Sequence, residues 1–161
     1  MTYLTFRHTI PAAYSLLPDR LRSPEATVML LAIGLQESKF AHRRQMPKGP
    51  ARGFWQFERA GGVEGVLNHA STGKTIRNAL EGLRYRSTMD AYQCHTAIEH
   101  NDVLACCFAR LLLWTLPDAL PGRLDVEKGW AQYIKAWRPG KPHISAWPEN
   151  YAMAWSLVDP E

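Results

Sequence analysis

Residues 28–40 read V-M-L-L-A-I-G-L-Q-E-S-K-F and are apolar on nearly every side until Glu37 and Ser38. A helix that is apolar all round belongs in a core, so we expect the chain to pack around it. Upstream, Ser23-Pro24-Glu25 supplies a capping hydroxyl, a proline suited to the first helical position and an acid for the first turn. The sequence therefore predicts a buried helix that runs to about Lys39 and carries Glu37 near its end.

The position of Glu37 predicts a carboxyl group with altered chemistry. At the edge of the core it is partly desolvated, which raises its pKa and lets it hold a proton near neutral pH. Cleavage of a glycosidic bond requires such a protonated carboxyl as its general acid. A glutamate at a helix end is more often simply solvated, so this assignment also depends on the residues that follow.

A basic loop and an aromatic turn come next. Prolines and a glycine interrupt residues 42–52, which predicts a loop and leaves a small hairpin open. In the turn at 53–56, G-F-W-Q, we expect Gln56 to bond a sugar amide or Glu37, and Phe54 and Trp55 to stack on a sugar or pack in the core. Four cations of the loop either attract carboxylates to a nearby cleft or are solvated: Arg43, Arg44, Lys48 and Arg52.

These residues resemble the signature of soluble lytic transglycosylases and goose-type lysozymes. In that family a helix ends in Glu-Ser, as at Glu37 and Ser38, and a loop leads to a Gly-Leu-Met-Gln type turn, matched by Gly53 and Gln56. The third family motif, Ala-Leu-Ala-Ala-Tyr-Asn-Ala-Gly, has its nearest counterpart in L-A-C-C-F-A-R-L at 104–111, where Phe108 replaces the tyrosine. The tail W-A-Q-Y-I-K-A-W-R-P-G-K-P is similar to that of small cell-wall hydrolases of phages and prophages.

The resemblance implies a single-domain, lysozyme-like helical fold over residues 1–161 and cleavage of the β-1,4 bond between N-acetylmuramic acid and N-acetylglucosamine in peptidoglycan. In a lytic transglycosylase one glutamate, here Glu37, protonates the leaving oxygen and then deprotonates the muramic 6-hydroxyl as the ring closes. No cofactor and no metal ion is implied. The residues expected to contact or position the glycan are Ser38, Gln56, Trp55, Phe54, Phe108 and Trp137.

Two other functions remain open. A lysozyme-type hydrolase uses a second carboxylate, for which we name Glu58 first, with Glu64, Glu99 and Asp102 as further acids that could approach Glu37. A non-catalytic binding module on a degenerate lysozyme scaffold would account for the altered third motif. A nucleic-acid-binding role is disfavoured, because the sequence contains no recognition-helix motif.

Composition limits the protein class more than the activity. The 161 residues are 46% hydrophobic with a net charge of +4, which fits one soluble domain with anionic partners. Three cysteines, Cys94, Cys106 and Cys107, lack disulfide or zinc spacing and are expected to be small buried hydrophobes. We expect a monomer without a signal peptide or stable membrane insertion, which is made in the cytoplasm. It would reach the cell wall as an endolysin through holin release or as a virion component.

The remaining chain is predicted to be helical, because no run alternates well enough to demand a sheet. The predicted class is all-α, or α with a minimal hairpin. We place helices at 9–17, around 63–67, 76–83, 89–98, from the Asn101-Asp102 cap to Pro117, 125–137 and 148–158. Gly61-Gly62 is expected to form a turn before the helix around 63–67.

Overall fold

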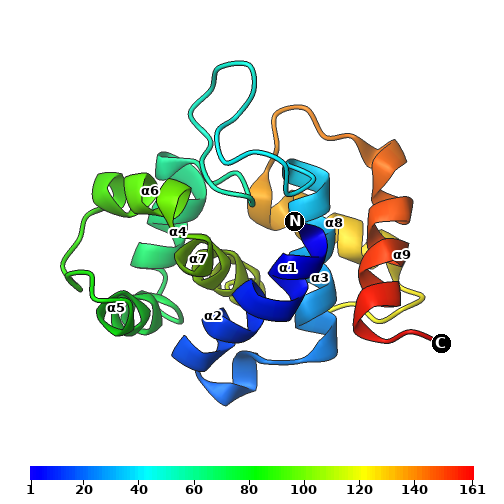
Figure 1. Ribbon diagram of the computed structural model, residues 1–161, viewed down its shortest axis with the longest axis horizontal. Coiled ribbons are helices and arrows are strands. Elements are labelled where there is room, and N and C mark those ends of the chain that lie inside the picture. The colour runs from blue at the N-terminus through cyan, green and yellow to red at the C-terminus, as the bar shows by residue number, and fades with distance from the viewer.

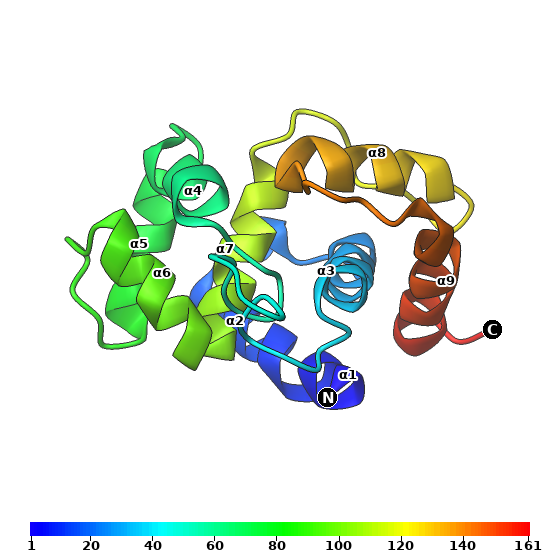
Figure 2. The same ribbon diagram turned by 90° about the horizontal axis from the view of Figure 1, so that it is seen from above.

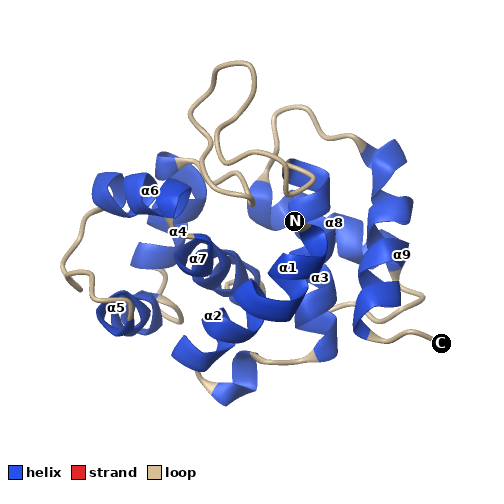
Figure 3. Ribbon diagram, viewed as in Figure 1, coloured by secondary structure: helices blue, strands red, loops and turns tan.

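The computed structural model describes all 161 residues as helices joined by loops, with no sheet (Figure 3). The all-α prediction is confirmed. The loop after the first buried helix forms no regular hairpin. It contains only two isolated β-bridges, which pair Arg52 with Arg44 and with Phe57. The elements are α1 Thr2–Leu4, η1 Thr5–Thr9, α2 Ile10–Leu16, η2 Asp19–Leu21, α3 Pro24–Glu37, η3 Arg59–Val63, α4 Glu64–Asn68, α5 Gly73–Gly82, α6 Ala91–His100, α7 Asp102–Trp114, α8 Val126–Trp137, η4 Ile144–Ala146 and α9 Trp147–Val158.

Helix α3 lies in the middle of the molecule, with α7, α8 and α9 around it (Figure 2). Ser23 caps it as predicted, because its Oγ accepts a hydrogen bond of 3.0 Å from the backbone N–H of Ala26. Every residue from 26 to 35 is buried. The helix ends at Glu37, slightly before the predicted end, because Lys39 and Phe40 adopt left-handed backbone angles with φ of 54° and 52°.

Helix α7 is the second buried helix. Asn101 caps it as predicted, since Asn101 Oδ1 accepts from the N–H of Leu104 at 3.0 Å. Its residues 104–113 are all buried and, except for Arg110, belong with α3 to one continuous hydrophobic cluster. Cys106 and Cys107 lie in this run, and Cys94 lies in α6. All three are free and buried, as predicted.

Two predicted boundaries are wrong. The first helix does not begin at Thr9 but continues from residue 2 to residue 16, with a wide π-helical turn, η1, just before Pro11. Proline lacks an N–H and crowds the carbonyl four residues earlier, and a wider turn accommodates both effects inside a helix. Gly61 and Gly62 likewise lie within η3 rather than in a turn before it. At Gly62 a Cβ atom would stand 2.6 Å from the Phe57 ring, so close packing explains this glycine.

The other predicted helices are present with ends shifted by a few residues. Asp90 caps α6 through a reciprocal bond pair with Gln93, Asp125 precedes α8, and Pro148 lies in the first turn of α9. None of the helices combines the length and the apolar character needed to cross a membrane.

Candidate active site

A cavity of about 900 Å³ opens at the C-terminal end of α3. Its walls come from the end of α3, the loop after it, residues 56–58 at the end of the G-F-W-Q turn, α8 and the loop that follows α8. Figure 1 shows both loops, in cyan and in orange, on the same side of the helical body. The lining residues are Gln36, Glu37, His42, Gln45, Met46, Pro47, Lys48, Ala51, Gln56, Phe57, Glu58, Gly61, Gly62, Leu112, Tyr133, Ala136, Trp137, Arg138, Pro139, Gly140, Lys141 and His143.

Glu37 lines this cavity with a largely buried carboxyl group. Burial raises its pKa from 4.5 to about 7, and the negative charge of Glu58 adds to the rise. A hydrogen bond of 2.6 Å from the Tyr133 hydroxyl to Glu37 Oε1 acts in the opposite direction, because it stabilises the carboxylate. The carboxyl can therefore give up or accept a proton near neutral pH, which is what general acid and base catalysis requires.

Tyr133 is a site residue that the sequence reasoning missed. It lies on α8, is buried, and stacks at 5.5 Å on the ring of Trp147. Burial and the neighbouring carboxyl of Glu37 raise the pKa of its hydroxyl, so Tyr133 acts as a hydrogen-bond donor. One signal was present in the sequence: Tyr133 lies four residues before Trp137, and side chains at this spacing share one face of a helix.

Trp137 lies in the cavity wall, where the sequence placed it as a glycan contact. Its Nε1 donates a hydrogen bond of 2.8 Å to the carbonyl of Trp55, and its ring meets that of Phe57 edge-on at 5.8 Å. These contacts connect α8 to the turn at 53–56. The half-buried indole therefore has a fixed position and still presents a face to the cavity.

Gln56 also lines the cavity, but its side chain is not bonded to Glu37. Its Nε2 donates at 2.8 Å to the carbonyl of Gly53, within the same turn. The backbone of Gln56 is left-handed, with φ of 51°, and Gly53 also has a positive φ of 77°. The left-handed backbone at Gln56 is therefore strained, whereas glycine adopts a positive φ without strain.

The aromatic residues of the turn lie in the core instead of on the cavity. Trp55 is completely buried, and its Nε1 donates at 2.8 Å to the carbonyl of Leu30 in α3. Phe54 is also buried, edge-on to Phe40 at 5.5 Å. Neither lines the cavity, and a fully buried side chain offers no surface to a ligand. The expectation that Phe54 and Trp55 contact the glycan is therefore wrong, and both side chains pack in the core.

Ser38 and Phe108 need the same correction. Ser38 Oγ donates to the carbonyl of Phe54 at 2.7 Å and accepts from the N–H of Phe40 at 3.1 Å, so it ties the end of α3 to the turn. Phe108 is fully buried in α7 and packs edge-on against Phe57 at 5.9 Å. Both support the cavity from behind and neither lines it.

Among the acids considered as a second carboxylate, only Glu58 shares the cavity with Glu37. Glu64 does not line it. Asp102 accepts two hydrogen bonds of 2.8 Å from Arg43, and Glu99 is paired with Arg44 and, at 3.6 Å, with Arg52. These two carboxylates hold the loop against α6 and α7 and are not available for catalysis in this arrangement.

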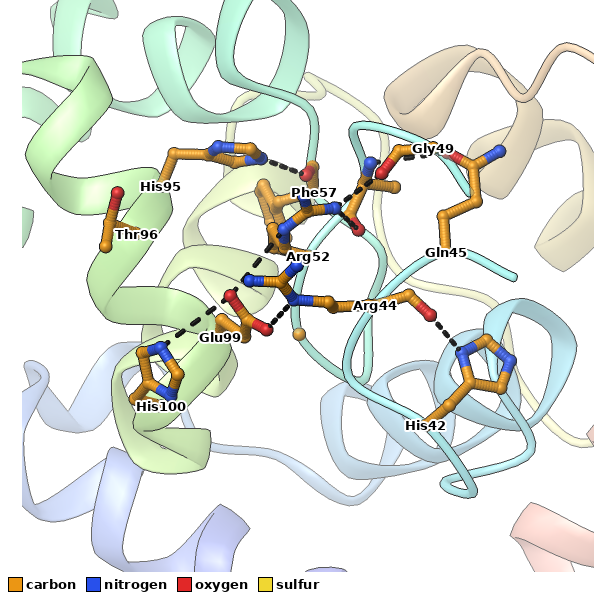
Figure 4. A network of polar contacts seen from close by, with 12 residues as sticks. His42, Arg44, Gln45, Gly49, Arg52, Phe57, His95, Thr96, Glu99 and His100 are labelled. Atoms are coloured by element: carbon orange, nitrogen blue, oxygen red, sulfur yellow. Dashed lines mark hydrogen bonds and ion pairs between the residues drawn. The ribbon is translucent and has the colours of Figure 1, made fainter. Parts of the chain in front are cut away.

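The four cations of the loop, which were expected beside the cleft, point in different directions. The three arginines of the loop turn towards α6 and α7, and Figure 4 shows Arg44 and Arg52 meeting Glu99 there. His95 of α6 donates at 2.9 Å to the carbonyl of Phe57, close to this network. Lys48 is the one cation of the four that lines the cavity. The three arginines are thus paired with carboxylates of α6 and α7 and do not line the cavity.

No group of three or more His, Cys, Asp and Glu side chains gathers in a way that could hold a metal ion. Comparisons of the chain with protein families, with curated proteins and with solved structures found no match.

Proposed function

We propose that the protein cleaves the β-1,4 bond between N-acetylmuramic acid and N-acetylglucosamine in peptidoglycan, as a lytic transglycosylase with Glu37 as its single acid and base. The observation that carries the proposal is a carboxyl group with a pKa of about 7 in the wall of a large open cavity. A glycosidic oxygen is a very weak base, so the reaction needs a carboxylic acid that is still protonated near neutral pH.

The steps follow from this one carboxyl group. Protonated Glu37 gives its proton to the glycosidic oxygen as the bond breaks, and positive charge develops on the muramic ring. The resulting carboxylate then takes the proton of the muramic 6-hydroxyl, whose oxygen bonds the anomeric carbon and closes a 1,6-anhydro ring. Tyr133 supports the carboxylate stage, because its hydroxyl donates to Glu37 Oε1.

The cavity provides material for holding a glycan beside Glu37. Trp137 offers an indole face fixed by its bond to the carbonyl of Trp55, and sugars pack their apolar faces on such rings. Gln56, which follows Trp55 in the turn, adds a polar side chain to the same cavity. Both residues take part in the proposal as substrate contacts, whereas Ser38, Phe54, Trp55 and Phe108 act by supporting the cavity.

A second candidate is a lysozyme-type hydrolase, which cleaves the same bond with the help of a second carboxylate. The observation that favours it is Glu58, which lines the cavity and whose charge raises the pKa of Glu37. In that reaction Glu58 would activate a water molecule or shield the developing positive charge, and the product would carry a reducing muramic end.

The test is mass spectrometry of muropeptides released from purified peptidoglycan by the wild type, Glu37→Gln and Glu58→Gln. The proposal expects anhydromuramic ends from the wild type and from Glu58→Gln, and a loss of about 100- to 10,000-fold in Glu37→Gln. Gln keeps the shape of Glu37 but has no titratable proton, so circular dichroism should show an unchanged fold.

Other products identify the alternatives. Reducing muramic ends that also depend on Glu58 would establish the hydrolase. Release of nothing by the wild type, together with sedimentation of the protein with peptidoglycan, would overturn catalysis and support a binding module. Strong DNA binding that falls steeply with salt would contradict a cell-wall role altogether.

A further inference from the structure

Three cations line the cavity and take part in no ion pair of the chain: Lys48, Arg138 and Lys141. They come from two different segments, the loop after α3 and the loop after α8, and their side chains lie at the walls of one space. This contrasts with Arg43, Arg44 and Arg52, which are satisfied by carboxylates. Unpaired cations that line one cavity are suited to receive an anionic group of a ligand.

The backbone of Arg138 adds an independent reason to assign it a function. Arg138 ends α8 in the left-handed region, with φ of 48° and ψ of 54°. Helices usually place glycine at this position, because a side chain there costs about 1 kcal/mol. A strained arginine at a cavity wall indicates that its side chain is needed there, since glycine would fit the turn better.

Both segments that carry the cations are anchored. Gln36, next to Glu37, donates at 2.7 Å to the carbonyl of His143 and accepts at 2.9 Å from Asn150, which holds the loop after α8 against the end of α3. On the other side, Arg43 and Arg44 bind α7 and α6. The cations therefore stand on walls of defined position, which lowers the entropy lost when a ligand binds.

The charge balance of the cavity favours an anion. Two carboxyl groups, Glu37 and Glu58, share the space with the three cations, and Glu37 retains its proton in part near neutral pH. The cations thus outnumber the carboxylates. Loss of the proton from Glu37 during the reaction would not remove the excess.

We propose that Lys48, Arg138 and Lys141 form an anion subsite that binds carboxylates attached to the glycan beside the bond that is cleaved. This inference rests on the proposed function for its substrate class. Peptidoglycan offers two sources of this chemistry: the lactyl carboxylate of muramic acid where the peptide has been removed, and the carboxylates of the peptide itself. A neutral oligosaccharide of N-acetylglucosamine carries neither.

The test is calorimetric titration of these three ligands, the peptide-bearing strand, the peptide-free strand and the neutral oligosaccharide. It is carried out in the Glu37→Gln background so that cleavage does not interfere. Arg138→Gly should weaken binding of carboxylate-bearing strands about tenfold and leave the neutral oligosaccharide unchanged. Lys141→Ala should act in the same direction. Lys135→Ala is the matched control, because this exposed lysine of α8 does not line the cavity.

Thermal unfolding separates this role from a structural one. Arg138→Gly should melt at the same temperature as the parent or higher, because glycine relieves the left-handed strain. Weakening with the peptide-free strand alone indicates the lactyl carboxylate, because in the peptide-bearing strand this group is a neutral amide. Weakening with the peptide-bearing strand alone indicates the carboxylates of the peptide, and weakening with both strands indicates that the subsite accepts either. Equal weakening with the neutral oligosaccharide, or no weakening with any ligand, would overturn the subsite. Because the readout is binding, it stands apart from muropeptide release: selective binding without cleavage by the wild type would refute only the proposed activity.

Discussion

The turn at 53–57 and the cavity-facing side of α8 are the two regions that surround Glu37, and they have opposite roles. The turn follows Glu37 closely in the chain, yet Phe54 and Trp55 are buried and only its last residues reach the cavity. Helix α8 supplies Tyr133, whose hydroxyl bonds Glu37 across 96 positions of sequence. Proximity in the chain to the reactive carboxyl therefore does not identify the residues that share its cavity.

The difference arises from what each region packs against. On one side of the turn Trp55 bonds α3, and on the other a Cβ on Gly53 would stand 2.7 Å from the side chain of Ile98 in α6 and 3.4 Å from Ala105 in α7. Space there is filled from both sides, and the aromatic rings complete the core. On α8, Tyr133 stacks on Trp147 and Trp137 bonds the turn, and both residues also lie at the cavity wall.

The largest expected effect is on the free energy of unfolding, and it distinguishes Trp55 in the turn from Trp137 in α8. Trp55→Ala should lower the free energy of unfolding by about 3–5 kcal/mol, because it removes a fully buried ring and its bond to the carbonyl of Leu30. Trp137→Ala should destabilise less, since this indole is only half-buried, but should strongly reduce release of muropeptides. Urea denaturation and the release assay on both variants measure this contrast. A greater destabilisation by Trp137→Ala would reverse the assignment of the two regions.

The second effect concerns the carboxyl group between them. Glu37 binds its proton more tightly in the folded state, with a pKa of about 7 against 4.5. The stability that this contributes is complete below the lower value and is lost as pH rises through the upper one. It amounts to about 3 kcal/mol.

Urea denaturation between about pH 4 and pH 8 checks this effect as the difference between wild type and Glu37→Gln. Gln has no proton to lose, so the variant should lack this decline. Glu58→Gln, with the neighbouring carboxyl removed, should retain it. Parallel curves for wild type and Glu37→Gln would show that Glu37 titrates as an ordinary solvated carboxyl.

The smallest effect is that of the Tyr133 hydroxyl. Tyr133→Phe removes a bond that lowers the pKa of Glu37, so this pKa should rise further above 7, by about 1 unit. The basic limb of the pH profile of cleavage should move upward by the same amount. Carbon NMR of the Glu37 carboxyl gives the shift directly. Tyr92→Phe, at an exposed position of α6, is the control, and an equal shift there would remove Tyr133 from the site.

Several parts of the molecule were predictable because their signals are local. The Ser23 cap, the apolar run after it and the carboxylate at its end lie within fifteen positions of one another, and together they predicted α3 and the raised pKa of Glu37. Asn101 marked the start of α7 in the same way. At Pro11 the local signal was misleading. The proline suggested that a helix starts there, whereas the wide turn η1 allows the helix to continue past the proline.

The sequence by itself determined the helical class, the buried helix that ends at Glu37 and the desolvation of its carboxyl group. Only the tertiary structure decided that Phe54, Trp55 and Phe108 fill the core, that Tyr133 bonds Glu37, and that the loop arginines pair with α6 and α7 while Lys48, Arg138 and Lys141 remain at the cavity. The physical reason is the range of each interaction. Caps and periodic apolar residues act within a few positions, whereas burial and charge pairing depend on which distant helices come to lie against one another.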